Sequence, residues 1–338
     1  MLAAKSLSIY GTYIKSVPEN YNQIKMTLHT NKSTFIPNTH FTTPVLFLIF
    51  NRPETTQQVF SAIRQAQPPR LYIGADGPRP EYPNETESCE FARSIATNVD
   101  WDCDVKTLFR ETNLGCGLAV TSAIDWFFEQ ESEGIILEDD TKPSEQFFKF
   151  VNFGLRKYRD DKNIGSICGY NPLTPNPNAN DRIIISNYPS LWGWGTWKNV
   201  WGKYSLQPDF HYLHKVTTIY RHIKHLRYTM YIMSILGGVE KGEIDTWCAQ
   251  FGFMFSEYKF KVVYPPINLI KNIGFSDQGT HTKGWDNTND ISNIRLDFIN
   301  LKESYDESFD ISRFNLERPN IYNRLIRKYK ILLRIFNR

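Results

Sequence analysis

Blocks of apolar and polar residues follow one another along the middle of the chain, and their spacing predicts a mixed α/β fold. Residues 45–50 are continuously apolar between Pro44 and Asn51, which is typical of a strand buried on both faces of a parallel sheet. Further short apolar runs predict strands at 71–75, 105–110, 134–137, 164–168, 182–186 and 259–264. Apolar positions at helical spacing predict helices at 54–67, 84–98, 117–130, 147–158 and 212–236. This alternation favours a mainly parallel, Rossmann-like sheet flanked by helices.

The ends of the chain differ from the middle. Residues 1–43 are polar and weakly patterned, and we expect an N-terminal extension there. Residues 44–290 should form the main domain, with halves at 44–142 and 143–290, and residues 291–338 a helical tail. Residues 318–338 hold seven basic residues and no acidic one, and their apolar residues fall on one helical face. Such a basic amphipathic helix either lies on an anionic membrane surface or packs on the domain with its cations in water.

Composition narrows the class of protein. The 39 basic and 36 acidic residues give a net charge of +3, which argues against a surface devoted to nucleic acid. The longest apolar run is too short to span a bilayer, and the first residues show no secretory signal. The five cysteines lack CxxC or metal-site spacing, as suits a reducing cytosol. We therefore expect a cytoplasmic protein, peripheral at the inner membrane face if the tail binds lipid.

Three adjacent carboxylates, Glu138, Asp139 and Asp140, directly follow the predicted buried strand at 134–137. In open parallel sheets, ligands bind at the carboxyl ends of the strands. A divalent cation would relieve the repulsion between the three anions, and hard oxygen ligands suit Mg²⁺ or Mn²⁺. The alternative is a solvated acidic turn that caps the next helix, but the preceding strand favours the metal site.

Polar and glycine-rich residues follow the other strands at the same predicted edge. They are Asn51 and Arg52 after the first strand, Asp76 after the second, and Arg110 and Asn113 after the third. Such a mixture suits a nucleotide, because the base needs polar partners, the phosphates need cations and a close approach needs glycine. The glycine spacing matches neither the dinucleotide-binding fingerprint nor the P-loop.

The densest aromatic patch lies at residues 191–201, which hold four of the eight tryptophans. Trp192 and Trp194 lie beside glycines and are candidates for stacking on the apolar face of a sugar. Trp197 and Trp201 are four residues apart on a predicted helix, so we expect them in the core. A purely structural aromatic cluster is the alternative for the whole patch.

The order of these motifs resembles that of the GT-A glycosyltransferases. The segments are LFLIFNRPE, IGADGPR, NLGCG, GIILEDD, SLWGWGTW, IDTW and NIGFSDQGTH. They are especially similar to bacterial nucleotide-diphospho-sugar transferases related to the Golgi enzyme that adds N-acetylglucosamine to mannose, and they span residues 44–285. The resemblance implies a GT-A fold in which residues 44–142 bind the nucleotide sugar and residues 143–290 the acceptor.

On the donor side, the resemblance implies a metal and nucleotide site. Asp140 would bind Mn²⁺ or Mg²⁺, and Asp139 would bind the metal or the ribose, with Glu138 completing a motif similar to the family's DxD. The residues that match the family's nucleoside-binding and donor-binding segments are Asn51, Arg52, Asp76, Arg110 and Asn113.

On the acceptor side, the resemblance implies that Asp245 is the catalytic base, as in inverting members, and Glu243 is the fallback. Asp245 lies in an aromatic stretch beside Trp247, where partial desolvation would make it a better base. A helix cap or a salt-bridged aspartate is the alternative. His281 matches a late histidine that touches the metal or the diphosphate in many of these enzymes, and a structural histidine is its alternative.

These features together favour a metal-dependent, inverting glycosyltransferase that uses a nucleotide-sugar donor, expected to be a UDP-sugar. The acceptor would be a glycan or a polyprenyl-linked glycan. One alternative is a sugar-phosphate nucleotidyltransferase, although such enzymes usually carry a glycine-rich loop with a basic residue after the first strand, where this chain has Asn51-Arg-Pro. The other is a non-catalytic carbohydrate-binding protein with the tryptophan patch as its site.

Overall fold

The first half of the fold follows the predicted alternation of strands and helices closely. The computed structural model describes residues 41–173, 182–208, 211–274 and 297–317. The elements up to the acidic triplet are β1 (Val45–Ile49), α2 (Pro53–Ala66), β2 (Arg70–Ala75), α3 (Glu85–Thr97), β3 (Asp104–Phe109), α4 (Gly115–Gln130) and β4 (Glu133–Glu138). The predicted N-terminal extension up to residue 40 and the basic segment 318–338 lie outside the described residues.

The second half is less regular and contains more short elements. After β4 come β5 (Thr141–Pro143), α5 (Glu145–Lys157), β6 (Ile164–Cys168), β7 (Arg182–Ser186), β8 (Trp194–Trp197), α6 (Lys198–Trp201) and α7 (Tyr212–Ile223). They are followed by α8 (Leu226–Glu240), α9 (Cys248–Tyr258), β9 (Lys261–Tyr264), β10 (Ile270–Asn272), a 3₁₀ turn (Phe298–Asn300), β11 (Lys302–Tyr305) and α10 (Glu307–Glu317).

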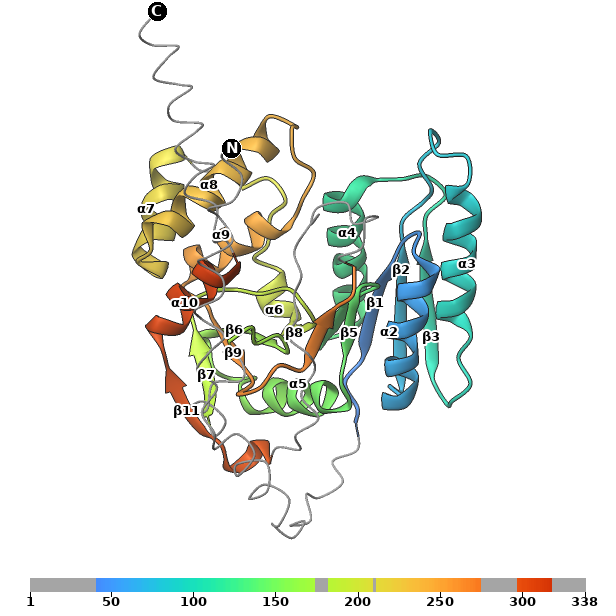
Figure 1. The fold of residues 1–338 in the computed structure, drawn as a ribbon, viewed down its shortest axis with the longest axis horizontal. Helices are drawn as coiled ribbons and strands as arrows, with labels where there is room; N and C mark the ends of the chain where they lie inside the picture. Colours follow the sequence, from blue (N-terminus) through green and yellow to red (C-terminus); the bar gives the residue numbers. More distant parts are fainter. Residues whose placement is uncertain (1–40, 174–181, 209–210, 275–296, 318–338) are drawn as a thin grey trace, which may run out of the picture. The chain divides into compact units, whose positions relative to one another are not determined.

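Nine strands of the described chain form one sheet in the order β11-β7-β9-β6-β8-β4-β1-β2-β3. The pairings of β3, β2, β1 and β4 are parallel, whereas β8 is antiparallel to both of its neighbours, β4 and β6. At the far edge, β9 is parallel to β6, and β7 is antiparallel to β9. The predicted mixed, mainly parallel α/β fold is therefore confirmed (Figure 1).

Helices cover both faces of this sheet. On one face α2 contacts α3 and α5, and α5 packs under β4, β6 and β8. On the other face α4 contacts β1, β2 and α6, and α9 closes over β8 through the ring of Phe251, whose centroid lies 5.0 Å from that of Trp194. A second apolar cluster lies beyond α9, where α7 and α8 pack on it with Phe314 of α10 (Figure 1). The first core draws on both halves of the chain, from β1 to β4 and from α5 onward.

Two features of the structure differ from the predicted elements. The helix predicted at 212–236 is broken, because Lys224 adopts a left-handed conformation (φ 55°) that ends α7. The side chain of His225 then accepts a hydrogen bond from the Tyr228 N–H and starts α8. The predicted tail boundary at 291 also cuts through the sheet, because β11 pairs with β7.

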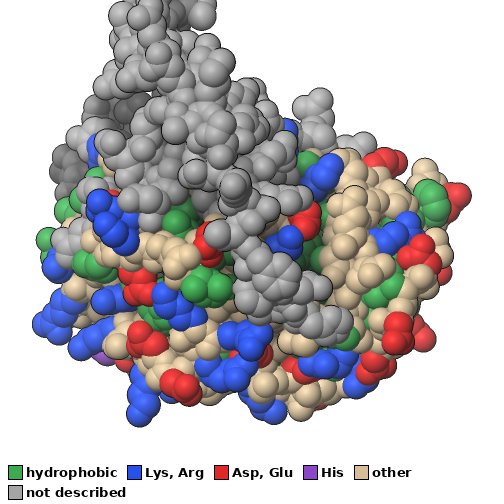
Figure 2. Space-filling model, turned by 90° about the horizontal axis from the view of Figure 1, so that it is seen from below, with side chains coloured by type: hydrophobic (Ala, Val, Ile, Leu, Met, Phe, Trp, Pro, Cys, Tyr) green, Lys and Arg blue, Asp and Glu red, His purple; other side chains and the backbone are tan. Residues whose placement is uncertain are grey.

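Charged side chains of both signs are interspersed on the face of the molecule seen in Figure 2. This distribution agrees with the small net charge of the whole chain. Within the described residues, none of the helices has the length and apolar character needed to cross a membrane.

Candidate functional site

The predicted donor residues come from adjacent parallel strands. β1 pairs in parallel with β2 on one side and with β4 on the other, so their carboxyl ends lie along one edge of the sheet. Asn51 and Arg52 follow β1, Asp76 follows β2, and the acidic triplet begins at the end of β4. The structure therefore places these side chains at the edge where open α/β sheets bind ligands.

The acidic triplet is tied to the β1 end by Arg52. The Nη1 atom of Arg52 donates a hydrogen bond to Oδ2 of Asp140 at 3.0 Å and lies 3.6 Å from Oδ1 of Asp139. The other oxygen of Asp139 accepts a hydrogen bond from the Phe50 N–H at 3.2 Å. The short connection between β1 and α2 thus holds two of the three carboxylates in place.

Negative charge is in excess at this position. Burial, followed by the charges of the other two carboxylates, raises the pKa of Glu138, and burial and the charge of Asp140 raise the pKa of Asp139. The Arg52 guanidinium opposes both shifts with a single positive charge. A divalent cation at this point would stabilise the ionised forms.

The oxygen ligands fit Mg²⁺ or Mn²⁺ held partly by a substrate. No group of three His, Cys, Asp or Glu side chains within the described part of the chain converges as a complete metal site. Mg²⁺ commonly takes one or two carboxylates and completes its shell with water and phosphate oxygens. Asp139 and Asp140 could provide those two carboxylates, and a nucleoside diphosphate the remaining ligands.

The chain returns to Asp140 after β10. The Ile273 N–H donates a hydrogen bond to the Asp140 carbonyl at 2.8 Å, and a Cβ atom at Gly274 would lie only 2.4 Å from Oδ2 of Asp140. Only glycine fits this approach without displacing the carboxylate. His281 follows Gly274 by seven residues and lies outside the described residues.

Asp76 binds its own chain with both carboxylate oxygens. Oδ1 accepts hydrogen bonds from the N–H groups of Gly77 and Leu114, each at 2.9 Å, and Oδ2 accepts one from Nδ2 of Asn113 at 2.9 Å. Burial raises the pKa of Asp76, although the bonds from the Leu114 and Gly77 N–H groups oppose this shift. In this structure Asp76 and Asn113 position the start of α4.

Arg110 and Asn51 also have protein partners. The Arg110 Nη2 atom donates to the Ser122 hydroxyl on α4 at 2.8 Å. The Asn51 side-chain amide donates to Glu85 at 2.7 Å, and Glu85 forms a further ion pair with Arg79. The bonds from Arg79 and Asn51 hold the pKa of Glu85 below its usual value, although burial alone would raise it.

Glu85 and Arg79 are additional residues of this edge that the sequence analysis missed. The guanidinium carbon of Arg79 lies 4.1 Å from the centre of the Tyr82 ring and 5.6 Å from that of Phe50. This arrangement leaves a cation and two aromatic rings beside the end of β1. The only available signal in the sequence was the arginine that closes the IGADGPR segment.

Asp245 lies against the first turn of α4. Its Oδ1 atom accepts a hydrogen bond from the Gly117 N–H at 2.8 Å, and a Cβ atom at Gly115 would come within 2.4 Å of its Oδ2 atom. The residue is exposed, as is Glu243, so the desolvation expected from the neighbouring Trp247 is wrong. Asp245 thus caps the α4 N-terminus from another segment, which was the alternative considered for it.

Cys116 connects the two sides of the site. Although this residue reaches solvent, burial of the thiol raises its pKa, and the charges of Glu138, Cys248 and Asp245 raise it further. Cys116 thus lies in the turn of α4 that Asp245 contacts through the Gly117 N–H. Sequence reasoning did not single out Cys116.

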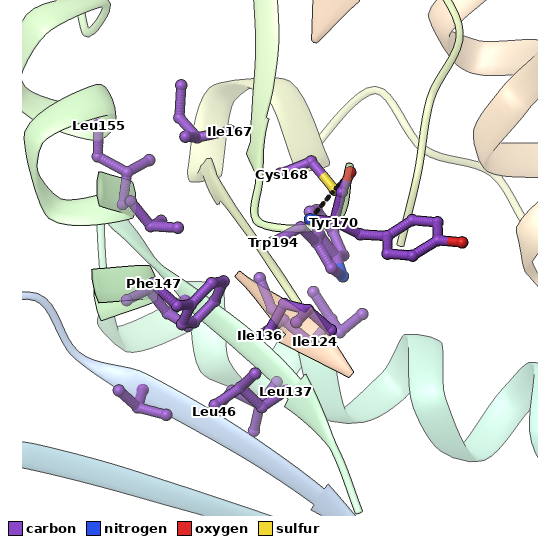
Figure 3. Packing of buried hydrophobic residues seen from close by; sticks show 14 of the residues in the cluster. Leu46, Ile124, Ile136, Leu137, Phe147, Leu155, Ile167, Cys168, Tyr170 and Trp194 are labelled. Carbon is purple, nitrogen blue, oxygen red and sulfur yellow. Dashed lines mark hydrogen bonds between the residues drawn. The ribbon is translucent and has the colours of Figure 1, made fainter. Parts of the chain in front are cut away.

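The tryptophan patch divides differently from the prediction. Trp194 lies in β8 with no exposed surface, packed among core side chains that include Ile124, Ile136 and Cys168 (Figure 3). No face of its ring is left for a sugar, which corrects the expectation for this residue. Trp192 is half-buried against Tyr170, with ring centroids 4.4 Å apart, and remains a candidate.

The two other tryptophans of the patch belong to the core as predicted. Trp197 and Trp201 are 5% and 3% exposed. The indole N–H of Trp201 donates to Oδ1 of Asp125 on α4 at 2.7 Å, and its ring stacks on Tyr204 with centroids 4.5 Å apart.

Comparison with known proteins adds only distant likenesses. No protein-family model and no curated protein matches the chain. Similar solved structures include HddC from Yersinia pseudotuberculosis, at 12% identity over 50% of this chain and 84% of that one with a TM-score of 0.30. The structure of HddC complexed with GMP-PN is 11% identical over 46% of this chain and 77% of that one, with a TM-score of 0.28.

A third solved structure is 4-diphosphocytidyl-2C-methyl-D-erythritolsynthase from Anaerococcus prevotii DSM 20548. It is 10% identical over 66% of this chain and 89% of that one, with a TM-score of 0.33. Likenesses at this level do not assign a reaction, which has to be argued from the site itself.

Proposed function

We propose that this chain is a metal-dependent glycosyltransferase that uses a nucleotide-sugar donor, with a UDP-sugar as the first candidate. The acidic triplet at the carboxyl edge of β4 carries the proposal, because its excess negative charge suits a divalent cation that also binds a diphosphate. The acceptor we propose is a glycan or a polyprenyl-linked glycan.

Residues of this chain would divide the work on the donor side. Asp139 and Asp140 would hold Mn²⁺ or Mg²⁺, which supplies positive charge for the departing diphosphate. Arg52 holds the two carboxylates in register through its contacts at 3.0 and 3.6 Å. The Arg79 cation and its two aromatic neighbours would bind the nucleoside beside the end of β1.

Asp245 is the base that we propose for the acceptor. Its carboxylate is exposed, so an acceptor hydroxyl can reach it, and the Gly117 N–H fixes its orientation through Oδ1. In a single displacement, the acceptor oxygen would bond to the anomeric carbon while the bond to the diphosphate oxygen breaks. The hydroxyl proton would pass to Asp245, and the configuration at the sugar would invert.

Nucleotidyl transfer to a sugar phosphate is the second candidate. A solved structure of distantly similar fold is a synthase whose name describes a diphosphocytidyl product. Against this reading, the connection between β1 and α2 consists of Phe50, Asn51 and Arg52 and has no glycine. A loop of this length and composition does not resemble the glycine-rich loop usual in those enzymes.

A thermal-shift panel with UDP-, GDP- and CMP-sugars and with the corresponding free sugars, each with and without Mn²⁺, tests the proposal directly. A shift that needs both nucleotide sugar and metal supports it. Absence of any shift contradicts both transferase readings, and a shift with free sugar alone favours a non-catalytic carbohydrate-binding protein. Release of a nucleoside diphosphate then indicates glycosyl transfer, whereas pyrophosphate release from a nucleoside triphosphate and a sugar phosphate indicates nucleotidyl transfer.

Two substitutions separate the proposed roles. Asp140→Ala should abolish metal-dependent transfer and donor hydrolysis, whereas Asp160→Ala, at an exposed aspartate after α5, should keep full activity. Asp245→Asn should lose transfer while it keeps nucleotide affinity in calorimetry. Loss of both properties in Asp245→Asn would mean that this side chain serves the fold alone.

A further inference from the structure

An exposed apolar and basic surface lies at the turn between α7 and α8. Five large apolar side chains of these two helices are exposed, with Leu226 at 61%, Tyr220 at 48% and Met230 at 46% nearest the turn. Residues 211–239 contain four Lys or Arg and no Asp or Glu. Exposed apolar side chains that gather next to one another mark interaction surfaces, whereas singly scattered ones do not.

The residues of this surface are neighbours by helix geometry. Tyr220 and Arg221 of α7 and the capping residue Lys224 fall within one turn of each other, and on α8 Leu226, Arg227 and Met230 do so. Only Lys224 and His225 separate the two helices. We call these six exposed side chains the α7–α8 corner.

The fourth cation of this stretch is excluded from the corner. Lys215 is only 4% exposed and forms an ion pair with Glu240. The three remaining cations, Arg221, Lys224 and Arg227, are exposed. The corner therefore contains three exposed basic side chains and three exposed apolar ones.

We propose that the α7–α8 corner docks on an anionic lipid bilayer. Leu226, Met230 and Tyr220 would enter the interfacial region, while the three cations meet lipid phosphates. This inference does not depend on the reaction proposed above.

The position of α10 adds an independent argument. The Arg227 guanidinium lies 3.5 Å from the side-chain oxygen of Asn315, so α10 ends beside the corner. The chain then continues into residues 318–338, which carry seven basic residues and no acidic one. The α7–α8 corner and the segment 318–338 both carry positive charge. Their mutual repulsion disfavours binding of this segment, from the same chain or from a second copy, to the corner. An anionic partner suits both.

Vesicle flotation with the full-length chain tests this inference. The wild-type protein should float with phosphatidylcholine vesicles that contain phosphatidylglycerol and not with phosphatidylcholine alone. The triple variant Arg221→Gln, Lys224→Gln and Arg227→Gln should bind about 100-fold more weakly, since each basic residue near an anionic surface contributes about 1 kcal/mol. A matched triple variant, Arg156→Gln, Lys162→Gln and Lys198→Gln, removes three exposed cations elsewhere and should bind as the wild type does.

The apolar part is tested by Leu226→Ser with Met230→Ser, both exposed and therefore without effect on folding. This variant should lose the binding that persists at high salt, where charge attraction is screened. Failure of the wild type to bind anionic vesicles would overturn the inference. Wild-type affinity of the corner triple variant, or equal losses in the matched control, would also overturn it, because binding would then come from elsewhere in the chain.

Discussion

Removal of Arg52 tests whether the carboxylates at the end of β4 form a cation site. In Arg52→Gln, Asp139 and Asp140 lose the guanidinium that lies 3.6 and 3.0 Å away. Breaking a buried ion pair costs about 3–5 kcal/mol. The three side chains are 10–22% exposed, so we expect a smaller effect than for a fully buried pair, a fall of about 2–3 kcal/mol in the free energy of unfolding.

Divalent cations should repair most of this loss. With Arg52 gone, the guanidinium no longer opposes the effect of burial, so the pKa values of Glu138 and Asp139 rise further. Mn²⁺ can replace the missing positive charge, and it should therefore stabilise this variant more than it stabilises the wild type. A Mn²⁺ concentration of 100 times the Kd would raise the free energy of unfolding by about 2.7 kcal/mol. This gain is comparable with the loss expected from Arg52→Gln. The assay is urea unfolding of both proteins in chelator and in Mn²⁺.

Arg159→Gln is the matched control for this experiment. Arg159 also pairs with a carboxylate at the sheet, that of Glu133 at 2.7 Å, but its side chain is 56% exposed. We expect a loss of at most about 1 kcal/mol, independent of Mn²⁺. The reasoning is refuted if the two variants are equally stable in chelator, or if Mn²⁺ leaves Arg52→Gln unchanged.

Three further predictions concern other parts of the fold. Burial lowers the pKa of His222 from 6.5 to about 4, so its stabilising contribution is complete above pH 6.5 and is lost as the pH falls toward 4. Because His222 is partly exposed, we expect its contribution to the free energy of unfolding to be about 2–3 kcal/mol. Urea denaturation between pH 4 and 6.5 should therefore show a shallower pH dependence for His222→Gln than for the wild type. Asp76→Ala should lower the free energy of unfolding by about 2–3 kcal/mol in urea, because it leaves several donors without their acceptor. Trp194→Ala should cost about 3–5 kcal/mol, whereas Trp192→Ala should cost much less and instead weaken donor or acceptor binding in calorimetry.

The sheet up to β4 could be predicted because its pattern is local. Strands β1, β2 and β4 are short apolar runs, each helix has its own spacing, and the alternation of strands and helices predicts the parallel pairing. From this it followed that Asn51, Asp76 and the acidic triplet share one edge, and the structure places them there.

The remaining features depend on contacts between distant segments. Trp194 is buried because Trp247 and Phe251 cover it from α9, about fifty residues later in the chain. Asp245 meets Gly117 across a separation of 128 residues. Neither the spacing around these residues nor their types reveal such partners, so the sequence analysis misjudged the burial of both Trp194 and Asp245.

The antiparallel strand β8 has a consequence for synthesis of the chain. It is the strand that joins the two halves of the sheet, lying between β4 and β6. Once residue 138 has left the ribosome, residue 194 follows after about 3–10 s at ordinary elongation rates. During that interval β4 is an edge strand with unpaired N–H and C=O groups, the kind of edge on which nascent chains associate. Slow translation between β4 and β8 should therefore lower the soluble yield of this protein.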